Sequence, residues 1–275
     1  MFFCYFFCGL TKVSYLCHMQ QGKYLCVAGL VGLASLFCSC RSHYSLSGIE
    51  RTRILVDSRY DAQIDNSLNE LMAPYKHRVD SIMSPVVGQV ARYMAASRPE
   101  SELSNLLADI LVWAGKNYGE TPDMGLYNIG GIRAALAKGD VTAGDVLDVA
   151  PFENKIAFVS LKGDVLMELF EQMAGTGGEA VSHGVQLVFT ADKHLKSARL
   201  NGEEIDLSRN YRVATIDYLT QGNDHLEAFL KKTQVNSPQE DSNNLRYIIM
   251  DYFREQMKKG VVVDREIEGR IVIEP

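Results

Sequence analysis

The sequence predicts an α+β fold, in which a mixed α/β sheet is flanked by helices, and two observations carry the prediction. Residues 103–114 place apolar side chains at three- and four-residue intervals, as one face of an amphipathic helix does. Residues 156–161 form a nearly continuous apolar run, which is typical of a buried strand. Because helical and strand patterns alternate without a regular βαβ rhythm, we expect a mixed sheet with helices on its faces, in one domain.

The helices are predicted from apolar spacing and from the residues at their ends. The strongest covers residues 101–114, where Glu102 lies in the first turn and interacts favourably with the helix dipole. Pro74 interrupts the helical pattern of residues 66–79. Gly139 is expected to end a helix over residues 134–137. The predicted helices cover residues 66–79, 101–114, 134–137, 142–147, 165–174 and 245–258.

The strands are predicted from short apolar or alternating runs between turn residues. Asn201 and Gly202 separate two such runs and predict a hairpin turn, because both residues tolerate positive φ. Residues 123–127 are either a connector or a strand. The predicted strands cover residues 54–56, 86–91, 156–161, 185–190, 198–205 (a hairpin), 211–216, 261–263 and 271–273.

Composition excludes two classes of function. The 275 residues carry a formal net charge of −6, which argues against binding of a nucleic acid polymer, because such proteins need a basic face. All six cysteines lie in the first 40 residues. The rest of the chain therefore has neither a disulfide scaffold nor a cysteine metal site.

The first 40 residues resemble a targeting segment rather than part of a fold. The apolar run 24–37 has the length of a signal h-region, and it is followed by Cys40, the expected lipidation site of a bacterial lipoprotein signal. A cleaved signal peptide and a retained anchor are the alternatives, and either Met1 or Met19 is the start. We expect residues 41–60 to be a tether, residues 61–275 a folded domain, and the location the cell envelope (periplasm or outer membrane, held by a lipid anchor) or, alternatively, secreted.

The segment 127–133 is the first candidate site. Gly130 and Gly131 allow close backbone approach to a ligand, Asn128 can donate and accept, and Arg133 offers a planar fork of donors for an anion. With a helix over residues 134–137, Arg133 would lie near a helix N-terminus. A glycine turn with an incidental surface arginine remains the alternative.

An ordered set of motifs extends this segment. Asn128-x-Gly130-Gly131-x-Arg133 is followed by Pro151-Phe152-x-Asn154, then Asn201-Gly202, then Tyr218-x-x-x-Gly222-x-Asp224. In this set the chain resembles the C-terminal domain of 5′-nucleotidases over about residues 60–275.

The resemblance implies a nucleotide site with defined roles. Phe152 and Tyr218 match the two aromatics that stack on the base, and Asp224 matches the carboxylate that binds the ribose hydroxyls. Asn128 matches the amide near the base, Arg133 faces the phosphate, and Gly130, Gly131 and Asn154 complete the substrate-binding set. Arg98 stands beside Ser97, where the family has a further phosphate-binding arginine.

Each of these residues also has a purely structural interpretation. Phe152 could belong to the core, Tyr218 could be an edge aromatic, Asp224 could cap the next helix, and Arg98 could be a solvated surface residue.

In the family a separate N-terminal metallophosphatase domain hydrolyses the ester with two metals. Of the six histidines, one lies in the targeting segment and the other five are scattered. We therefore expect no catalytic residue, metal or cofactor in this chain. The prediction is a nucleotide- or nucleoside-recognition subunit of a split 5′-nucleotidase, with the divalent metals on a separate metallophosphatase chain. The alternatives are a nucleoside-binding lipoprotein without a catalytic role and a scaffold that has lost its ligand.

Overall fold

The computed structural model describes residues 46–60 and 65–274, and its contacts divide the chain into two units, residues 1–64 and 65–275. In the first unit, residues 46–57 form no regular element, and Ser58–Tyr60 form the short 3-10 helix η1. The predicted strand at 54–56 is therefore wrong. Its three apolar side chains are all exposed, and no described strand pairs with it. Cys40 and the apolar run 24–37 lie outside the described residues.

A five-stranded sheet contains the run that the sequence marks as a buried strand. β4 (Ile156–Lys162) and β9 (Asn210–Ile216) are antiparallel. Ile156 lies opposite Ile216 at one end of the pair, and Lys162 lies opposite Asn210 at the other. β2 runs parallel to β9. Because both kinds of pair occur in one sheet, the predicted mixed sheet is confirmed. The strands, in spatial order, are β10 (Thr233–Asn236), β4 (Ile156–Lys162), β9 (Asn210–Ile216), β2 (Met124–Tyr127) and β5 (Ala180–Val181).

Two smaller sheets complete the strand structure. The predicted hairpin is confirmed, since Asn201 and Gly202 both have positive φ, 54° and 83°, between β7 and β8. The C-terminal strand β11 joins β6 in parallel. One sheet has the order β11 (Ile271–Glu274), β6 (Val185–Thr190), β7 (Leu195–Leu200) and β8 (Glu203–Glu204), and the other pairs β1 (Val86–Val90) with β3 (Gly139–Thr142).

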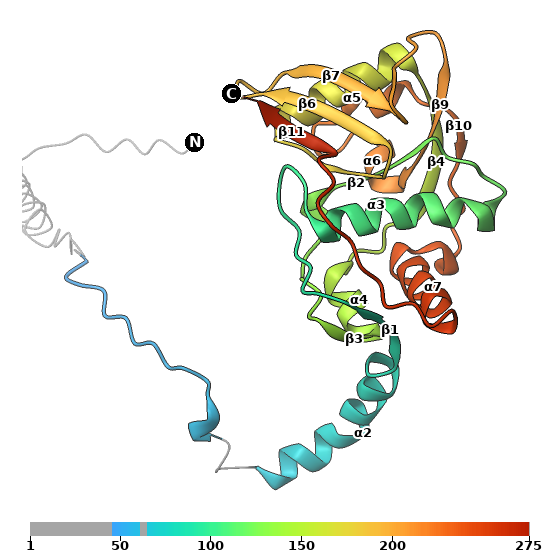
Figure 1. Cartoon of the computed structure of the whole chain (residues 1–275). Coiled ribbons are helices and arrows are strands. Elements are labelled where there is room, and N and C mark those ends of the chain that lie inside the picture. Colours follow the sequence, from blue (N-terminus) through green and yellow to red (C-terminus); the bar gives the residue numbers. More distant parts are fainter. Residues whose placement is uncertain (1–45, 61–64, 275) are drawn as a thin grey trace, which may run out of the picture. The chain divides into compact units, whose positions relative to one another are not determined.

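Helices flank these sheets, as the sequence predicts. In Figure 1, α3 (Glu102–Ala114) crosses the middle of the domain. Its apolar face is buried against β2, β5 and α7 (Leu245–Lys258). Ser101 and Ser104 cap its first turn reciprocally. Pro74 lies inside α2 without ending it. The helices are α2 (Asn66–Met83), α3 (Glu102–Ala114), α4 (Ala143–Val149), α5 (Gly163–Thr176), α6 (Asp217–Thr220) and α7 (Leu245–Lys258).

Two short predictions are wrong because tertiary pairing overrides local preference. Residues 134–137 are not helical: Leu136 is buried and exchanges two backbone hydrogen bonds with Met94, at 2.9 and 3.0 Å. Gly139, with φ 115°, starts β3 instead of ending a helix. Residues 261–263 form no strand, and Val263 makes only an isolated bridge to Val90.

Among the described residues, no helix combines the length and the apolar character needed to span a bilayer.

The start of α5 gives a test of the fold. A Cβ on Gly163 would lie 2.0 Å from the backbone oxygen of Asp206, whereas a Cβ on Gly175, in the same helix, would meet open space. Gly163→Ala should therefore lower the free energy of unfolding by about 3 kcal/mol, because backbone must move. Gly175→Ala should raise it by up to about 1 kcal/mol through helix propensity. Urea unfolding followed by circular dichroism measures both, and similar midpoints for the two variants would contradict the close approach.

Candidate functional site

Most of the residues predicted to bind the substrate lie together. Seven of the nine line one cavity of about 220 Å³: Asn128, Gly130, Gly131, Phe152, Asn154, Tyr218 and Asp224. Arg133 and Arg98 are not among its lining residues. Whether the cavity binds a nucleotide stays a prediction.

Sheet register explains why these distant segments meet. Ile156 at the start of β4 pairs with Ile216 at the end of β9. Phe152, just before β4, and Tyr218, just after β9, therefore leave the sheet at the same edge. β2 is parallel to β9, so the loop that follows Tyr127 leaves the sheet at that edge as well.

Hydrogen bonds fix the backbone next to the two aromatic residues, and both rings stay accessible. Asp217 Oδ1 accepts hydrogen bonds from the backbone N–H of Lys155 (3.1 Å) and of Tyr218 (2.8 Å), which joins the two loops. Arg246 donates to the carbonyl oxygen of Pro151 at 2.9 Å, next to Phe152. Phe152 and Tyr218 are 47% and 36% exposed. Neither ring therefore belongs to the core.

Asp224 connects two sides of the cavity. Its Oδ1 accepts from the Tyr218 hydroxyl at 2.9 Å, and its Oδ2 accepts from Asn128 Nδ2 at 2.6 Å. The bond to Asp224 raises the pKa of Tyr218, because it stabilises the protonated phenol. With its carboxylate used in this way, Asp224 does not cap the following 3-10 helix η4 (Glu227–Lys231), whose N-cap is Leu226.

The turn that carries Asp224 has positive φ at two residues that are not glycine. Gly222, Asp224 and His225 all have positive φ, at 80°, 56° and 63°. Aspartate and histidine are among the non-glycine residues that adopt this region most often. Asn223 adds a side-chain bond to the carbonyl oxygen of Tyr218 at 2.8 Å. This side-chain bond adds to the backbone bond from the N–H of Gly222 to the carbonyl oxygen of Leu219 at 3.0 Å.

Of the two adjacent glycines, only Gly131 lies where a side chain would collide with its neighbours. Ile129–Gly131 form the 3-10 helix η3, and a Cβ on Gly131 would lie 2.7 Å from Asn128 Oδ1 and 2.9 Å from the Tyr127 hydroxyl. A Cβ on Gly130 would meet nothing within 4 Å. Asn128 Oδ1 is buried and has no hydrogen-bond partner among the described residues. Gly131 therefore allows Asn128 to direct its amide toward Asp224.

The two arginines lie differently from what the sequence predicts. Arg133 is exposed and donates weakly to the carbonyl oxygen of Gly130 (3.3 Å); no helix begins behind it. Arg98 donates to the carbonyl oxygen of Gly178 at 2.8 Å and forms an ion pair with Glu179. Arg98 is therefore neither a free surface cation nor a lining residue of the cavity.

Glu179 is a positioning residue that sequence reasoning missed. Its side chain is 1% exposed, and its Oε2 accepts the backbone N–H of Ile129 at 2.6 Å. Burial raises the pKa of Glu179, although the bonds to Ile129 and Arg98 act in the opposite direction. A glutamate after a run of glycines looks like a surface residue, and its partner is a backbone group 50 residues away. No pattern in the sequence could have identified it.

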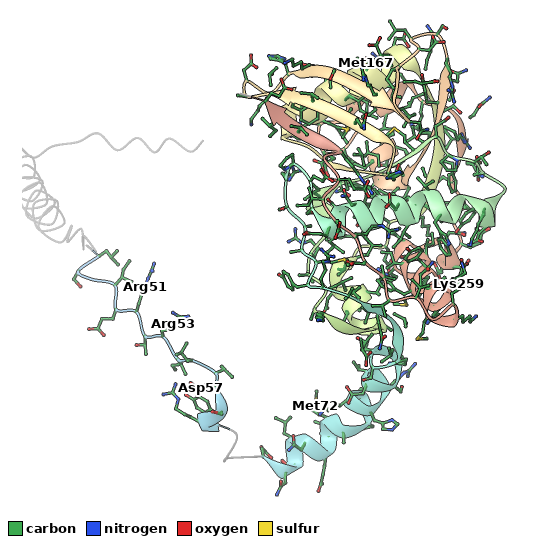
Figure 2. The ribbon with its side chains drawn as sticks, in the orientation of Figure 1. Arg51, Arg53, Asp57, Met72, Met167 and Lys259 are labelled. Atoms are coloured by element: carbon green, nitrogen blue, oxygen red, sulfur yellow. The ribbon has the colours of Figure 1, made fainter. Side chains whose placement is uncertain are left out.

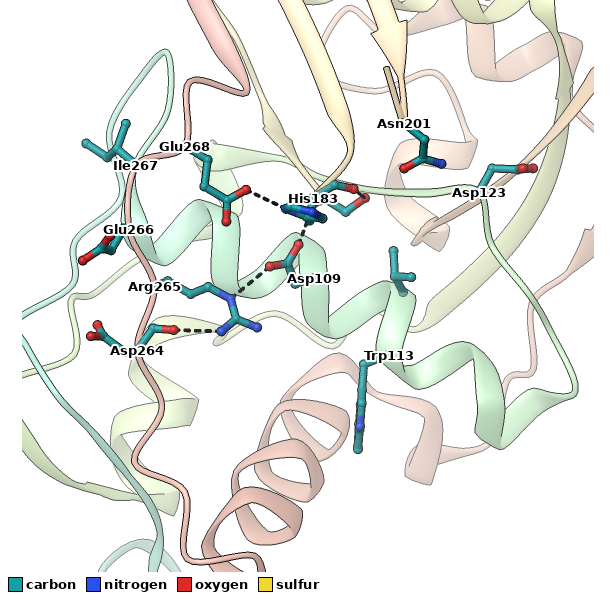
Figure 3. A pocket seen from close by; sticks show the side chains of 12 residues that line it. Asp109, Trp113, Asp123, His183, Asn201, Asp264, Arg265, Glu266, Ile267 and Glu268 are labelled. Carbon is teal, nitrogen blue, oxygen red and sulfur yellow. Dashed lines mark hydrogen bonds and ion pairs between the residues drawn. The ribbon is translucent and has the colours of Figure 1, made fainter. Parts of the chain in front are cut away.

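A larger cavity of about 850 Å³ lies between α3 and residues 264–268 (Figure 3), but its acidic groups are already engaged. Asp109 pairs with Arg265 and Arg270 at 3.0 and 2.9 Å. Glu268 pairs with Arg270 and lies 2.8 Å from His183. Within residues 46–60 and 65–274, no group of three or more His, Cys, Asp or Glu side chains could hold a metal ion.

The glycine pair supplies a matched test of the loop. Gly131→Ala should lower the free energy of unfolding by about 1–3 kcal/mol, because the new methyl group overlaps Asn128 and Tyr127. Gly130→Ala should leave it within about 0.5 kcal/mol, as expected for a surface position. Chemical denaturation measures both variants. A Gly131→Ala variant as stable as Gly130→Ala and the parent would contradict the predicted overlap.

Glu179 gives a second test. Glu179→Ala should lower the free energy of unfolding by about 1–3 kcal/mol, because the N–H of Ile129 loses its acceptor. Glu179→Gln keeps an oxygen for that bond and should lose less. Thermal and urea unfolding measure the difference. Equal losses would mean that the ion pair with Arg98, rather than the bond to Ile129, provides the stabilisation.

Comparisons with known proteins identify the family. The family described as "5'-nucleotidase, C-terminal domain" matches residues 86–231, more than half of the chain. The trifunctional nucleotide phosphoesterase protein YfkN of Bacillus subtilis is 29% identical over 217 residues, which are 72% of this chain and 14% of that protein. Protein UshA of Yersinia enterocolitica is 25% identical over 166 residues, 58% of this chain and 30% of that one.

A solved structure has a similar fold. The 5'-nucleotidase precursor of Thermus thermophilus superposes with a TM-score of 0.64 at 28% identity, over 75% of this chain and 43% of that one. This chain thus spans less than a third of the two curated relatives and less than half of the solved relative. The family match, the fold and the grouping of the motif residues lead to one conclusion: the chain belongs to the 5′-nucleotidase C-terminal domain family.

Proposed function

We propose that this chain is the nucleotide-recognition subunit of a split 5′-nucleotidase, and that a separate metallophosphatase chain hydrolyses the phosphate ester. The observation that supports it most is the placement of Phe152 and Tyr218. Two large aromatic side chains remain exposed at one cavity although the domain has a well-buried core. Exposed aromatic rings around a cavity with a few polar groups are typical of a ligand site.

Each lining group has a role in this proposal. The base stacks between Phe152 and Tyr218, which contributes about 1–3 kcal/mol. Asp224 accepts hydrogen bonds from the ribose hydroxyls; its two oxygens each have one donor from the protein and keep a further lone pair. Asn128 fixes Asp224 from the other side. Arg133 is exposed and free to approach the phosphate.

The size of the cavity supports a model in which only part of the nucleotide lies inside it. The volume of about 220 Å³ is below the range of roughly 300–1,000 Å³ of pockets that enclose a whole drug-sized ligand. We infer that base and ribose occupy the cavity and that the phosphate stays outside it. The scissile ester is then accessible to a second protein, and binding of base and ribose positions it for attack.

The described residues do not fit the two-metal chemistry of the family, because they contain no group that could hold a metal. We therefore place the divalent metals on the separate chain and assign no catalytic residue here.

We also propose that the chain is held in the cell envelope through a lipid on Cys40, with secretion as the alternative. A Listeria monocytogenes relative described as a cell wall protein, 25% identical over 222 residues, supports an extracytoplasmic location.

A nucleoside-binding lipoprotein without a catalytic partner is the second candidate function. It is favoured by the cavity volume, which suits a base and a ribose without the phosphate. Recovery of a metallophosphatase chain with this protein from the native envelope supports the first function. Its repeated absence, with intact nucleoside binding, supports the second.

The proposal is tested by calorimetric titration of AMP and adenosine into residues 41–275, the chain without its predicted targeting segment. Phe152→Ala and Tyr218→Ala should each weaken binding by about 10-fold or more, because one stacking face is lost. Tyr93→Ala, which removes an exposed tyrosine that does not line the cavity, is the matched control and should bind as the parent does.

Three results would contradict the nucleotide site. The first is no heat of binding from the parent chain with either ligand. The second is unchanged affinity in both cavity variants. The third is equal weakening by Tyr93→Ala.

A further inference from the structure

Two separate hydrogen bonds hold Tyr218 to the turn that carries Asp224. The backbone carbonyl oxygen of Tyr218 accepts from the Asn223 side chain at 2.8 Å, and its hydroxyl donates to Asp224 Oδ1 at 2.9 Å. Figure 2 draws the side chains in the orientation of Figure 1, where the label α6 marks the segment that contains Tyr218. The bond from Asn223 does not involve the ring, so the turn stays linked to Tyr218 without the hydroxyl.

Asp224 receives one protein donor on each oxygen of its carboxylate. Oδ1 accepts from the Tyr218 hydroxyl, and Oδ2 accepts from Asn128 Nδ2 at 2.6 Å. An ionised carboxylate has about four lone-pair sites, so each oxygen keeps one that is free. All three residues line the cavity. Two neighbouring free acceptors at a cavity match two hydroxyls on adjacent carbon atoms, as in the cis-diol of a ribose.

The hydroxyl of Tyr218 adds a constraint that Asn128 alone does not provide. A hydrogen bond to one carboxylate oxygen leaves the group free to rotate, whereas a bond to each oxygen defines its plane. Among the described residues, Tyr218 supplies the only side-chain bond to Oδ1 of Asp224. The carboxylate is therefore oriented before a ligand arrives, and less ordering remains to oppose binding.

We propose that the hydroxyl of Tyr218 is a positioning group that holds Asp224 ready to accept both hydroxyls of a ribose; this rests on the nucleotide function proposed above. The ring of the same residue stacks on the base. One side chain thereby couples base stacking to ribose recognition, and the site selects ribose over deoxyribose. A phenylalanine in place of Tyr218 would keep the stacking face and lose the coupling.

The test compares adenosine with 2′,3′-dideoxyadenosine, which presents the same base without the two hydroxyls. Calorimetric titration of the full chain should show about 10-fold tighter binding of adenosine, because the analogue leaves the free acceptors of Asp224 without donors. In Tyr218→Phe the affinity for adenosine should fall about 5-fold, because the carboxylate is no longer fixed. The affinity for dideoxyadenosine should change by less than about 2-fold, because the ring still stacks.

Asp224→Ala completes a double-mutant cycle, which isolates the coupling between the two side chains. This variant should bind both ligands with similar affinity, and adding Tyr218→Phe to it should change neither affinity. Tyr93→Phe is the matched control, because it removes the hydroxyl of an exposed tyrosine that does not line the cavity. It should bind both ligands as the parent does.

Three results would overturn the positioning role. The first is an undiminished preference for adenosine in Tyr218→Phe. The second is an equal loss of affinity for both ligands in that variant, which would show that the hydroxyl only supports the turn. The third is equal binding of the two ligands by the parent chain. Each of these leaves the proposed nucleotide site in place, whereas a parent chain that binds neither ligand would remove that function and this proposal together.

Discussion

The pairing of Ile156 with Ile216 is the constraint on which the rest of the site depends. It fixes the start of β4 beside the end of β9, and β2 follows because it is parallel to β9. A strand register that slipped by one residue would turn every side chain of β4 to the opposite face. Six of the seven residues of β4 are buried, so both of its faces are packed, and a slip would place side chains in spaces of the wrong size. Core packing, rather than any contact between the lining residues, is therefore what brings Phe152 and Tyr218 to one edge.

On this frame, polar side chains complete the local geometry at the edge. Asp217 joins the two loops that carry Phe152 and Tyr218. Asp224 connects Tyr218 to Asn128, and Glu179 accepts a hydrogen bond from the backbone N–H of Ile129. These groups bind one another without a ligand, so little ordering remains to oppose binding. The hydrogen bond to Asp224 raises the pKa of Tyr218, because it stabilises the protonated phenol that donates to Asp224.

Long elements and the motif residues could be predicted from the sequence, because their signals are local and repeated. The heptad-like spacing of α3 and the apolar run of β4 each extend over several residues, and neither has a competing pattern. Residues 134–137 failed for the opposite reason. Four residues with a helical preference gain less than Leu136 gains by pairing with Met94 and entering the core. Glu179 could not be predicted, since its role depends on a backbone group that only the fold brings to it.

Arg98 lies beside the cavity, but its guanidinium is engaged by the protein itself. Its guanidinium satisfies Glu179, which is nine-tenths or more buried and would be an isolated charge without it. Transferring Arg98 to a phosphate would leave that carboxylate unpaired beneath the loop of Asn128, so the ion pair competes with any such movement. Arg133 would lose much less on moving, because its single hydrogen bond is to the carbonyl oxygen of Gly130, at 3.3 Å. Releasing Arg133 therefore costs less than releasing Arg98, which supports the proposed role of Arg133 in facing the phosphate.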